Sequence, residues 1–215
     1  MRIYAVADIH GRPHRVARIQ ENVARFTPDA LVVAGDIARF GRAETALAAL
    51  GEMTLPVLAI RGNWDRARME VLMAHHPRIV SLHLKKVCVN GVDFVGVDGT
   101  LALPFRCRVC MKEKHVLEKI DPLLDRHSVL VAHPPPRGTL DEVFGRFHAG
   151  STGLFELISR RQPALFICGH IHERPGTAFI GETLVVNCNM GRRGAGALIE
   201  FEKGRNPEAR MLEEE

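Results

Sequence analysis

The sequence has few of the features that mark secreted and membrane proteins. Its five cysteines are irregularly spaced, which excludes the kind of disulfide framework that stabilises small secreted domains. No apolar run approaches the roughly 20 residues that a transmembrane helix needs. The N-terminus enters a strand pattern directly, without the hydrophobic region of a signal peptide. We therefore expect a cytoplasmic protein that does not enter the membrane.

Low-complexity segments, internal repeats and linkers are also missing. A chain of 215 residues is long enough to form one domain with a substantial core. We expect a single domain over residues 1–215, of which about 206–215 form a solvated tail. The sequence carries no signal for a particular oligomeric state.

A gathered basic surface is another feature that the sequence lacks. The net charge of +4 and the pI near 9.0 suit a polyanionic partner, but the 29 basic residues are scattered and 25 acidic residues offset them. Nucleic acid is therefore not the expected partner. Cys107 and Cys110 have metal-ligand spacing, but no second pair completes a structural zinc site, so we expect ordinary thiols.

What the sequence does contain is a recurring arrangement of short apolar runs that end in polar residues. Continuous runs of Val, Ile and Leu bounded by Gly or Pro predict strands that are buried on both faces. Each run is followed by residues that could hold a metal ion or a phosphate. The five segments are RIYAVADIHG, DALVVAGDIARFG, VLAIRGNWD, SVLVAHPPP and ALFICGHIHERPG.

Helical patterns lie between the strands, and hairpin patterns follow later in the chain. Helical periodicity is present in RVARIQENVARF, MEVLMAHH, HVLEKIDPLL and STGLFELISRR, the last with Ser151 or Thr152 as its N-cap. Asn90-Gly91 between alternating apolar residues predicts a hairpin. TAFIGETLVVNCNMG and GALIEFEKG predict two more strands. The sequence thus predicts an α/β fold in which an α/β half joins a hairpin-rich half.

The polar residues at the strand ends form a candidate metal site, because ligands of open α/β sheets collect outside the carboxyl ends of the strands. Any one of them has an ordinary structural explanation, such as a turn or a helix cap. Together they offer carboxylate, imidazole and amide donors that suit Mn, Fe, Zn, Ni or Co and are too many for one tetrahedral ion. We therefore expect two divalent metal ions. The candidate ligands are Asp8, His10, Asp36, Asn63, His133, His170 and His172.

The blocks DIHG, GDIARFG, GNWD, AHPPP and GHIHERPG, in this order, resemble the five signature blocks of the calcineurin-like metallophosphoesterases. The resemblance implies a four-layer α-β-β-α sandwich with two central mixed β-sheets flanked by helices. It implies that one metal ion is held by Asp8, His10 and His172. It implies that the other is held by Asn63, His133 and His170, with Asp36 as the bridge.

The resemblance also implies hydrolysis of phosphate esters. Two ions about 3.5–4 Å apart would activate a bridging hydroxide for in-line attack on phosphorus. We expect a small substrate, nucleotide-like among the possibilities, with phosphodiesters slightly favoured over phosphomonoesters. A non-catalytic scaffold is the main alternative, although a scaffold has no reason to keep all the donors. A nuclease is a further alternative, but the capping domain and basic stripe expected of one are not visible in the sequence.

One position departs from the family pattern. The commonest form of the GNWD block has a histidine after the asparagine, which supplies a proton to the leaving oxygen, and here that position is Trp64. An indole N–H donates a hydrogen bond but does not titrate near pH 7. Trp64 is therefore either a packing residue or, with Asn63, part of the substrate site, where its flat ring would meet a nucleobase or aryl group. His148 is the candidate for a substitute catalytic acid.

Overall fold

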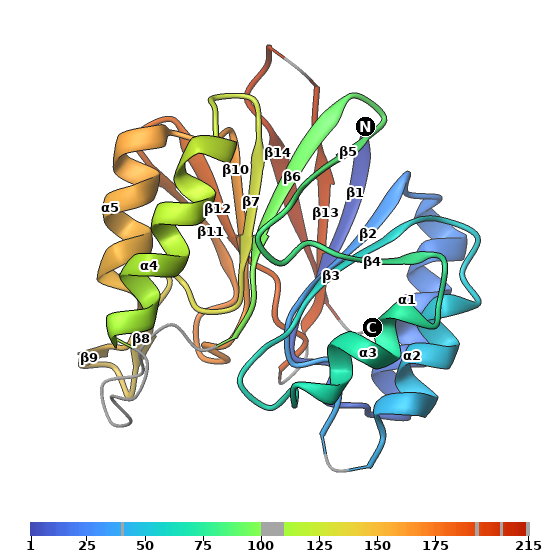
Figure 1. Ribbon diagram of the computed structural model, residues 1–215. Coiled ribbons are helices and arrows are strands. Elements are labelled where there is room, and N and C mark those ends of the chain that lie inside the picture. Colours follow the sequence, from blue (N-terminus) through green and yellow to red (C-terminus); the bar gives the residue numbers. More distant parts are fainter. Residues whose placement is uncertain (40, 100–109, 192–193, 203, 214–215) are drawn as a thin grey trace.

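The computed structural model describes residues 1–39, 41–99, 110–191, 194–202 and 204–213, with the side chains of 110–112 left out. In this part of the chain, two six-stranded sheets lie face to face and helices cover the outer side of each (Figure 1). The expected four-layer α-β-β-α sandwich is confirmed. A separate two-stranded hairpin, β8 (Glu142–Val143) and β9 (Phe147–His148), lies below α4 in Figure 1.

The first sheet has the strand order β14-β13-β1-β2-β3-β4. Its strands are β1 (Arg2–Val6), β2 (Ala30–Ala34), β3 (Val57–Ile60), β4 (Ile79–Ser81), β13 (Gly194–Glu200) and β14 (Glu208–Glu213). The strands β1 to β4 are parallel, whereas β13 runs antiparallel to β1. Its outer face is covered by α1 (Pro13–Phe26), α2 (Ala43–Gly51) and α3 (Arg68–Ala74).

The second sheet has the strand order β11-β12-β10-β7-β6-β5. Its strands are β5 (Lys86–Val89), β6 (Val92–Val97), β7 (Val129–Ala132), β10 (Leu165–Cys168), β11 (Gly176–Ile180) and β12 (Thr183–Asn187). The four central strands are parallel and both edge strands are antiparallel to their neighbours, so this sheet is mixed too. Its outer face is covered by α4 (Cys110–Ile120), the short 3-10 helix η1 (Asp121–Leu123) and α5 (Thr152–Arg161).

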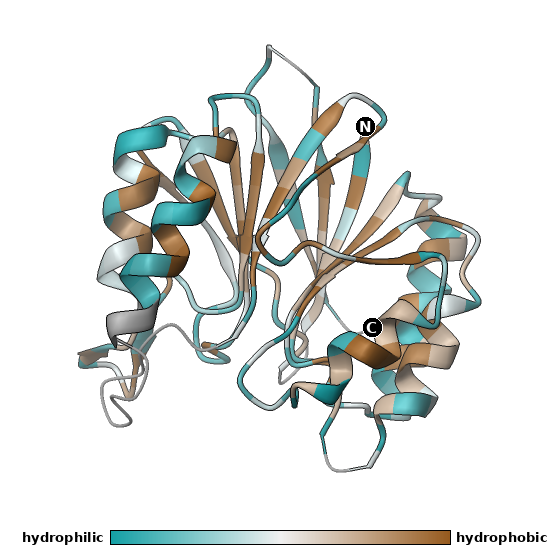
Figure 2. Ribbon diagram, in the orientation of Figure 1, coloured by the Kyte–Doolittle hydropathy of each residue, from teal (hydrophilic) through white to brown (hydrophobic). Residues whose placement is uncertain are grey.

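The central strands are apolar on both faces because each face packs against another layer. In β1, Ile3 and Ala5 pack between the two sheets, whereas Tyr4 and Val6 pack beneath the helices of the first sheet. The strands are accordingly the most hydrophobic part of the molecule in Figure 2. This layering explains why the strand segments are continuously apolar rather than alternating.

Local signals in the sequence are confirmed at two positions. The Ser151 Oγ accepts a hydrogen bond from the Leu154 N–H at 2.9 Å, which makes it the N-cap of α5. Asn90 and Gly91 have φ angles of 50° and 79° and connect β5 to β6, as a tight hairpin turn requires. The segment TAFIGETLVVNCNMG was expected to form one strand. It forms two instead, β11 and β12, which are joined in a hairpin that turns at Gly181.

The expectation of a solvated tail over about 206–215 was wrong for the part that the structure describes. Residues of β14 pair with β13, with Met211 opposite Ala197. Ala209 and Met211 pack partly buried against the core between the sheets, whereas Glu208 and Arg210 alternate with them. Because charged residues alternate with apolar ones, the sequence looks polar although one face of the strand is apolar.

Two other features of the fold bear on the expectations from sequence. Cys107 lies outside the described residues, as does the side chain of Cys110, so the fate of this pair stays a prediction. None of the helices in the described part of the chain is long and apolar enough to cross a membrane.

Candidate metal centre

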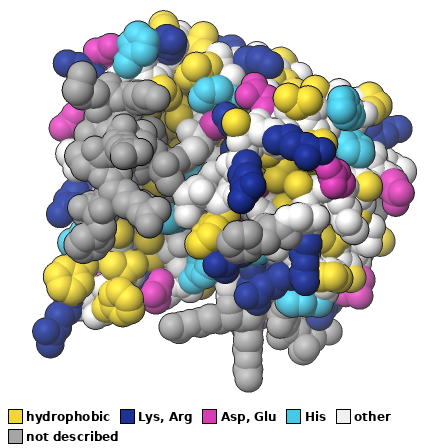
Figure 3. All heavy atoms as spheres, turned by 60° about the horizontal axis from the view of Figure 1, so that its bottom comes forward, with side chains coloured by type: hydrophobic (Ala, Val, Ile, Leu, Met, Phe, Trp, Pro, Cys, Tyr) yellow, Lys and Arg dark blue, Asp and Glu magenta, His cyan; other side chains and the backbone are white. Residues whose placement is uncertain are grey.

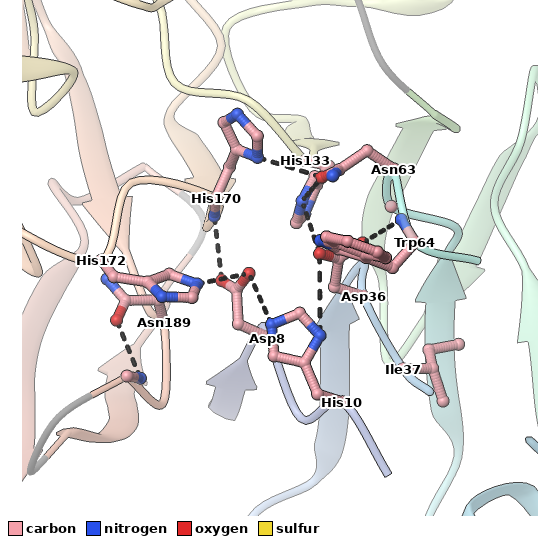
Figure 4. A network of polar contacts seen from close by, with 12 residues as sticks. Asp8, His10, Asp36, Ile37, Asn63, Trp64, His133, His170, His172 and Asn189 are labelled. Carbon is pink, nitrogen blue, oxygen red and sulfur yellow. Dashed lines mark hydrogen bonds and ion pairs between the residues drawn. The ribbon is translucent and has the colours of Figure 1, made fainter. Parts of the chain in front are cut away.

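The candidate ligands follow the carboxyl ends of five parallel strands that meet at one edge of the sandwich. Asp8 and His10 follow β1, Asp36 follows β2 and Asn63 follows β3. From the second sheet, His133 follows β7, and His170 and His172 follow β10. Figure 4 shows these side chains gathered in one continuous network. The structure therefore brings together all the residues that were predicted from the sequence as metal ligands.

Asp36 lies between the two halves of this network and is almost completely buried. Its Oδ2 is 3.9 Å from His10 Nδ1 and 3.5 Å from His133 Nε2. Its Oδ1 accepts a hydrogen bond from the Trp64 backbone N–H at 2.9 Å (Figure 4). Asp36 thus joins the loop after β1 to the loop after β7 across the interface between the sheets.

Asp8 is the second buried carboxylate of the network. Its Oδ1 is 3.0 Å from His172 Nε2 and 3.8 Å from His10 Nε2, and its Oδ2 accepts the His170 N–H at 2.9 Å. The Arg15 guanidinium donates to the backbone carbonyl of Asp8 and so supports the loop from beneath.

Asn63 and two histidines form the other side of the network. The Asn63 Oδ1 lies 2.9 Å from His133 Nε2 and 3.1 Å from His170 Nδ1. The other ring nitrogen of His133, Nδ1, is 2.8 Å from the Ala34 carbonyl oxygen, which can only accept a hydrogen bond. That contact places the proton of a neutral His133 on Nδ1 and leaves Nε2 as the ligand atom.

The network shifts the pKa values of its members in opposite directions. Burial alone would raise the pKa of Asp8, but the His172 and His133 side chains and the His170 N–H lower it to about 2. Burial would lower the pKa of His133, yet the Asp36 and Asp8 carboxylates raise it to about 9. For His170, burial and the nearby His133 lower the pKa to about 4. Asp8 is therefore ionised at neutral pH, and an ion binding at His133 displaces a proton.

The other two imidazoles differ from each other as well. Burial lowers the pKa of His10, and the Asp36 and Asp8 carboxylates offset part of this effect. The close Asp8 carboxylate raises the pKa of His172, against a smaller effect of burial.

Several of these residues have strained backbone conformations. The φ angles of Asp8, His10, Asp36 and His170 are 61°, 54°, 54° and 69°. This left-handed region costs a non-glycine residue about 1–3 kcal/mol, and such residues cluster at functional sites. These backbone conformations lower the stability of the fold, and they direct the side chains toward a common point.

Two buried polar atoms of the network fit a metal ion. Among the described residues, Asp8 Oδ1 and His10 Nδ1 are buried and make no hydrogen bond of good geometry, although His172 Nε2 lies 3.0 Å from Asp8 Oδ1. The ligand atoms of Asp8, His10 and His172 lie within 4.8 Å of one another, as do those of Asp8, Asp36 and His133. Buried polar atoms without partners are costly unless something binds them. The donor set and its spacing therefore suit divalent cations.

Asp65, the last residue of the GNWD block, supports two of the ligand loops. Its carboxylate accepts the N–H groups of Ile37 and Ala38 at 3.0 Å each and that of Gly62 at 2.8 Å. These bonds tie the residues that follow Asp36 to the residue that precedes Asn63. Burial raises the pKa of Asp65, and the three N–H donors offset part of the rise.

Replacing Asp65 with asparagine should lower the free energy of unfolding by about 1–3 kcal/mol, because an amide turns its NH₂ group toward backbone donors and leaves at least one unpaired. Urea denaturation of the metal-free protein measures this effect without involving the ions. Asp93→Asn is the matched control and should cost less than about 1 kcal/mol, since in the described part of the chain that half-exposed carboxylate pairs with Lys86, at 3.2 Å. Equal losses in both variants would show that Asp65 does not hold the loops.

A pair of buried asparagines supports the loop that carries His170 and His172. Asn187 and Asn189 both donate to the Ile171 carbonyl, at 2.9 and 3.0 Å, and Asn189 also donates to the Asn187 side chain at 3.0 Å. The sequence segment VVNCN places two asparagines two residues apart at the end of a buried strand. That spacing was the available signal for this support, but neither asparagine was among the predicted site residues.

The two residues expected to act in substrate binding or catalysis lie in different places. Trp64 lies at the edge of the network; the residue is 42% exposed, and the Arg39 guanidinium is 3.9 Å from the ring centroid. His148 lies on β9, where its Nδ1 is 2.7 Å from the buried Asp141 Oδ1. The described contacts of His148 do not include a member of the network, so its role as an acid stays a prediction.

The fold and the site agree with what comparison with known proteins shows. Residues 1–174 match the family model described as calcineurin-like phosphoesterase. An uncharacterized protein of Methanocaldococcus jannaschii, MJ1162, is 29% identical over 196 residues that cover 87% of each chain.

Two solved structures share the fold at low sequence identity. TT1561 of Thermus thermophilus is 17% identical with a TM-score of 0.75 over 98% of both chains. A protein described as a novel archaeal phosphodiesterase is 14% identical, with a TM-score of 0.53 over 99% of this chain and 100% of that one. From the match over residues 1–174 and the assembled strand-end residues, we conclude that the chain belongs to the calcineurin-like phosphoesterase family.

Proposed function

We propose that this chain is a dinuclear metal-dependent phosphoesterase that hydrolyses small phosphodiesters more readily than phosphomonoesters. The observation that carries the proposal is the buried network itself, in which carboxylate, imidazole and amide donors from five strand ends meet and two buried donor atoms make no hydrogen bond of good geometry. The family supports hydrolysis of phosphate esters by a metal-dependent route. The similar fold of the archaeal phosphodiesterase agrees with a preference for diesters.

In the proposed arrangement, the ligands form two sets that share one carboxylate. Asp36 is the shared ligand because its Oδ2 faces His10 of one set and His133 of the other, at 3.9 and 3.5 Å. Asp8 lies in both groups of close donor atoms and keeps the two sets near each other. The first set is Asp8, His10 and His172, and the second is Asn63, His133 and His170.

The chemistry divides between the ions and the chain. Two divalent ions would polarise phosphate oxygens and lower the pKa of bound water toward neutrality. The residues of the chain fix where this happens: the Ala34 carbonyl orients His133, the His170 N–H orients Asp8, and the Trp64 N–H orients Asp36. These second contacts hold each ligand in one rotamer, so little reorganisation is needed when an ester binds.

Removing and restoring metal tests the proposal. Dialysis against EDTA should abolish hydrolysis of bis(p-nitrophenyl) phosphate, and addition of one of Mn, Fe, Zn, Ni or Co should restore it at two ions per chain. The same additions should raise the melting temperature, because an ion that binds only the folded state stabilises it. The panel should include cyclic nucleotides, nucleotides and phosphomonoesters.

The two readouts separate an enzyme from a scaffold. A protein that binds two ions, gains thermal stability and hydrolyses none of the diesters or monoesters with any of the metals would be a metal-binding scaffold. A protein that hydrolyses diesters at the same rate after complete removal of metal would overturn the dinuclear mechanism.

A further inference from the structure

A pocket of about 370 Å³ opens next to the candidate metal centre. Its walls come from the loop and helix that follow β2 and from the loop and helix that follow β3. The lining residues are Ala38, Arg39, Gly41, Ala43, Glu44, Trp64, Arg66, Arg68, Met69 and Leu72. The volume lies in the range of pockets that hold small organic ligands.

Two residues that line the pocket are close along the chain to candidate metal ligands. Trp64 lines the pocket, follows the candidate ligand Asn63 and donates its N–H to Asp36 at 2.9 Å. Ala38 also lines the pocket and is two residues from Asp36, with its N–H held by Asp65 at 3.0 Å. Trp64 and Ala38 thus place one wall of the pocket beside the network.

The lining combines flat surfaces with positive charge. Arg39 stacks over the Trp64 ring at 3.9 Å, so the wall offers an indole and a guanidinium plane, and both of these surfaces stack on aromatic rings. Met69 and Leu72 add apolar surface. Three arginines and one glutamate line the pocket, and Glu44 pairs with Arg68 at 2.8 Å, so the net charge of the lining is positive. Figure 3 shows Lys and Arg side chains gathered on this face of the molecule.

We infer that this pocket binds the organic substituent of the phosphate ester and selects a planar aromatic group that carries a second negative charge. The inference rests on the proposed function, since it takes the phosphate to be held at the metal centre. The aromatic ring stacks against the Trp64 and Arg39 wall, and the second anionic group meets Arg66. An aliphatic or small substituent gains neither contact.

Binding of non-hydrolysable phosphonates tests the inference without any need for turnover. The probes are methylphosphonate, cyclohexylphosphonate, phenylphosphonate and 4-carboxyphenylphosphonate, titrated by calorimetry into the metal-loaded protein. Phenylphosphonate should bind about threefold to tenfold more tightly than the cyclohexyl compound, as expected of an aromatic contact. The carboxylate should add about tenfold. Trp64 is the only tryptophan of the chain, so its fluorescence reports whether the ring enters this pocket.

Paired variants separate the two contacts. Trp64→Leu should remove the advantage of phenyl over cyclohexyl and leave methylphosphonate binding unchanged. Arg66→Met should remove the advantage of the carboxylate and leave that of the ring. The controls are Phe179→Leu and Arg205→Met, because Phe179 is an exposed aromatic residue of β11 and Arg205 lines a different hollow of about 230 Å³.

Each outcome supports or overturns the inference. Equal affinities of all four phosphonates, within twofold, in a protein that still hydrolyses diesters would overturn the pocket assignment and leave the phosphoesterase proposal intact. The same would follow from ring-dependent affinity that Trp64→Leu does not change. The expected order of affinities, together with quenching of Trp64 fluorescence, in a protein that hydrolyses nothing would support the pocket and contradict the proposed function instead.

Discussion

Asp36→Asn is expected to reduce diester hydrolysis at least about a hundredfold and to lower the metal content of both proposed sites together. The substitution keeps the size of the side chain but removes the charge that faces His10 and His133. The Asn amide also sets an NH₂ group against either the Trp64 N–H or the imidazoles. Because the proposed arrangement makes Asp36 the shared ligand, neither ion should be retained normally without it.

Elemental analysis decides this prediction, together with activity at saturating metal. Asp93→Asn is again the control, because the half-exposed Asp93 carboxylate pairs with Lys86. This variant should retain the metal content and the activity of the parent. The melting temperature of the metal-free variant shows whether the fold survives. A folded Asp36→Asn protein that holds two ions and hydrolyses at the parental rate would remove Asp36 from the site.

The main part of this site could be predicted because it depends on strand ends. Each of the five strands is apolar on both faces, and in a sheet of parallel strands the first polar residues after such runs meet at one edge. Asp8, Asp36 and His133 are therefore close in space although the chain separates them widely. The resemblance to the calcineurin-like family added the division of the ligands into two sets, which the geometry does not test.

The supporting contacts could not be predicted in the same way. In the sequence Asp65 is only the last residue of the GNWD block, and only the packed loops show that it binds backbone N–H groups from two of them. Asn189 and β14 (Glu208–Glu213) likewise depend on neighbours far away in the sequence. His148 was the candidate for a substitute catalytic acid, but its pairing with Asp141 is set by the β8–β9 hairpin and could not be seen in the sequence. Such roles arise from tertiary contacts, which periodicity does not report.

Trp64→His is expected to change the dependence of the rate on the leaving group. If position 64 faces the leaving oxygen, the parent enzyme has no acid there, and its rate should fall steeply as the pKa of an aryl leaving group rises. An imidazolium at this position would donate a proton to the departing oxygen. The variant should therefore gain most on the poorest leaving groups, by at most about 10²–10⁴, and change little on the best ones. A series of methyl aryl phosphates measures this slope in kcat.

The contacts of Asp65 and Trp64 limit the gain expected from Trp64→His. Asp65 is committed to three backbone N–H groups, so it should not orient a new imidazole, and the gain should fall below the upper limit. The substitution also removes an aromatic wall next to Arg39, which should change KM. Phe179→His controls for a new surface imidazole, and metal content and melting temperature must match the parent before slopes are compared.

If the parent already has a shallow slope, another group supplies the proton, and His148→Ala should then steepen it. If Trp64→His folds, holds both ions and leaves the slope unchanged, position 64 does not face the leaving group, and the only tryptophan of the chain acts through the neighbouring pocket or through packing.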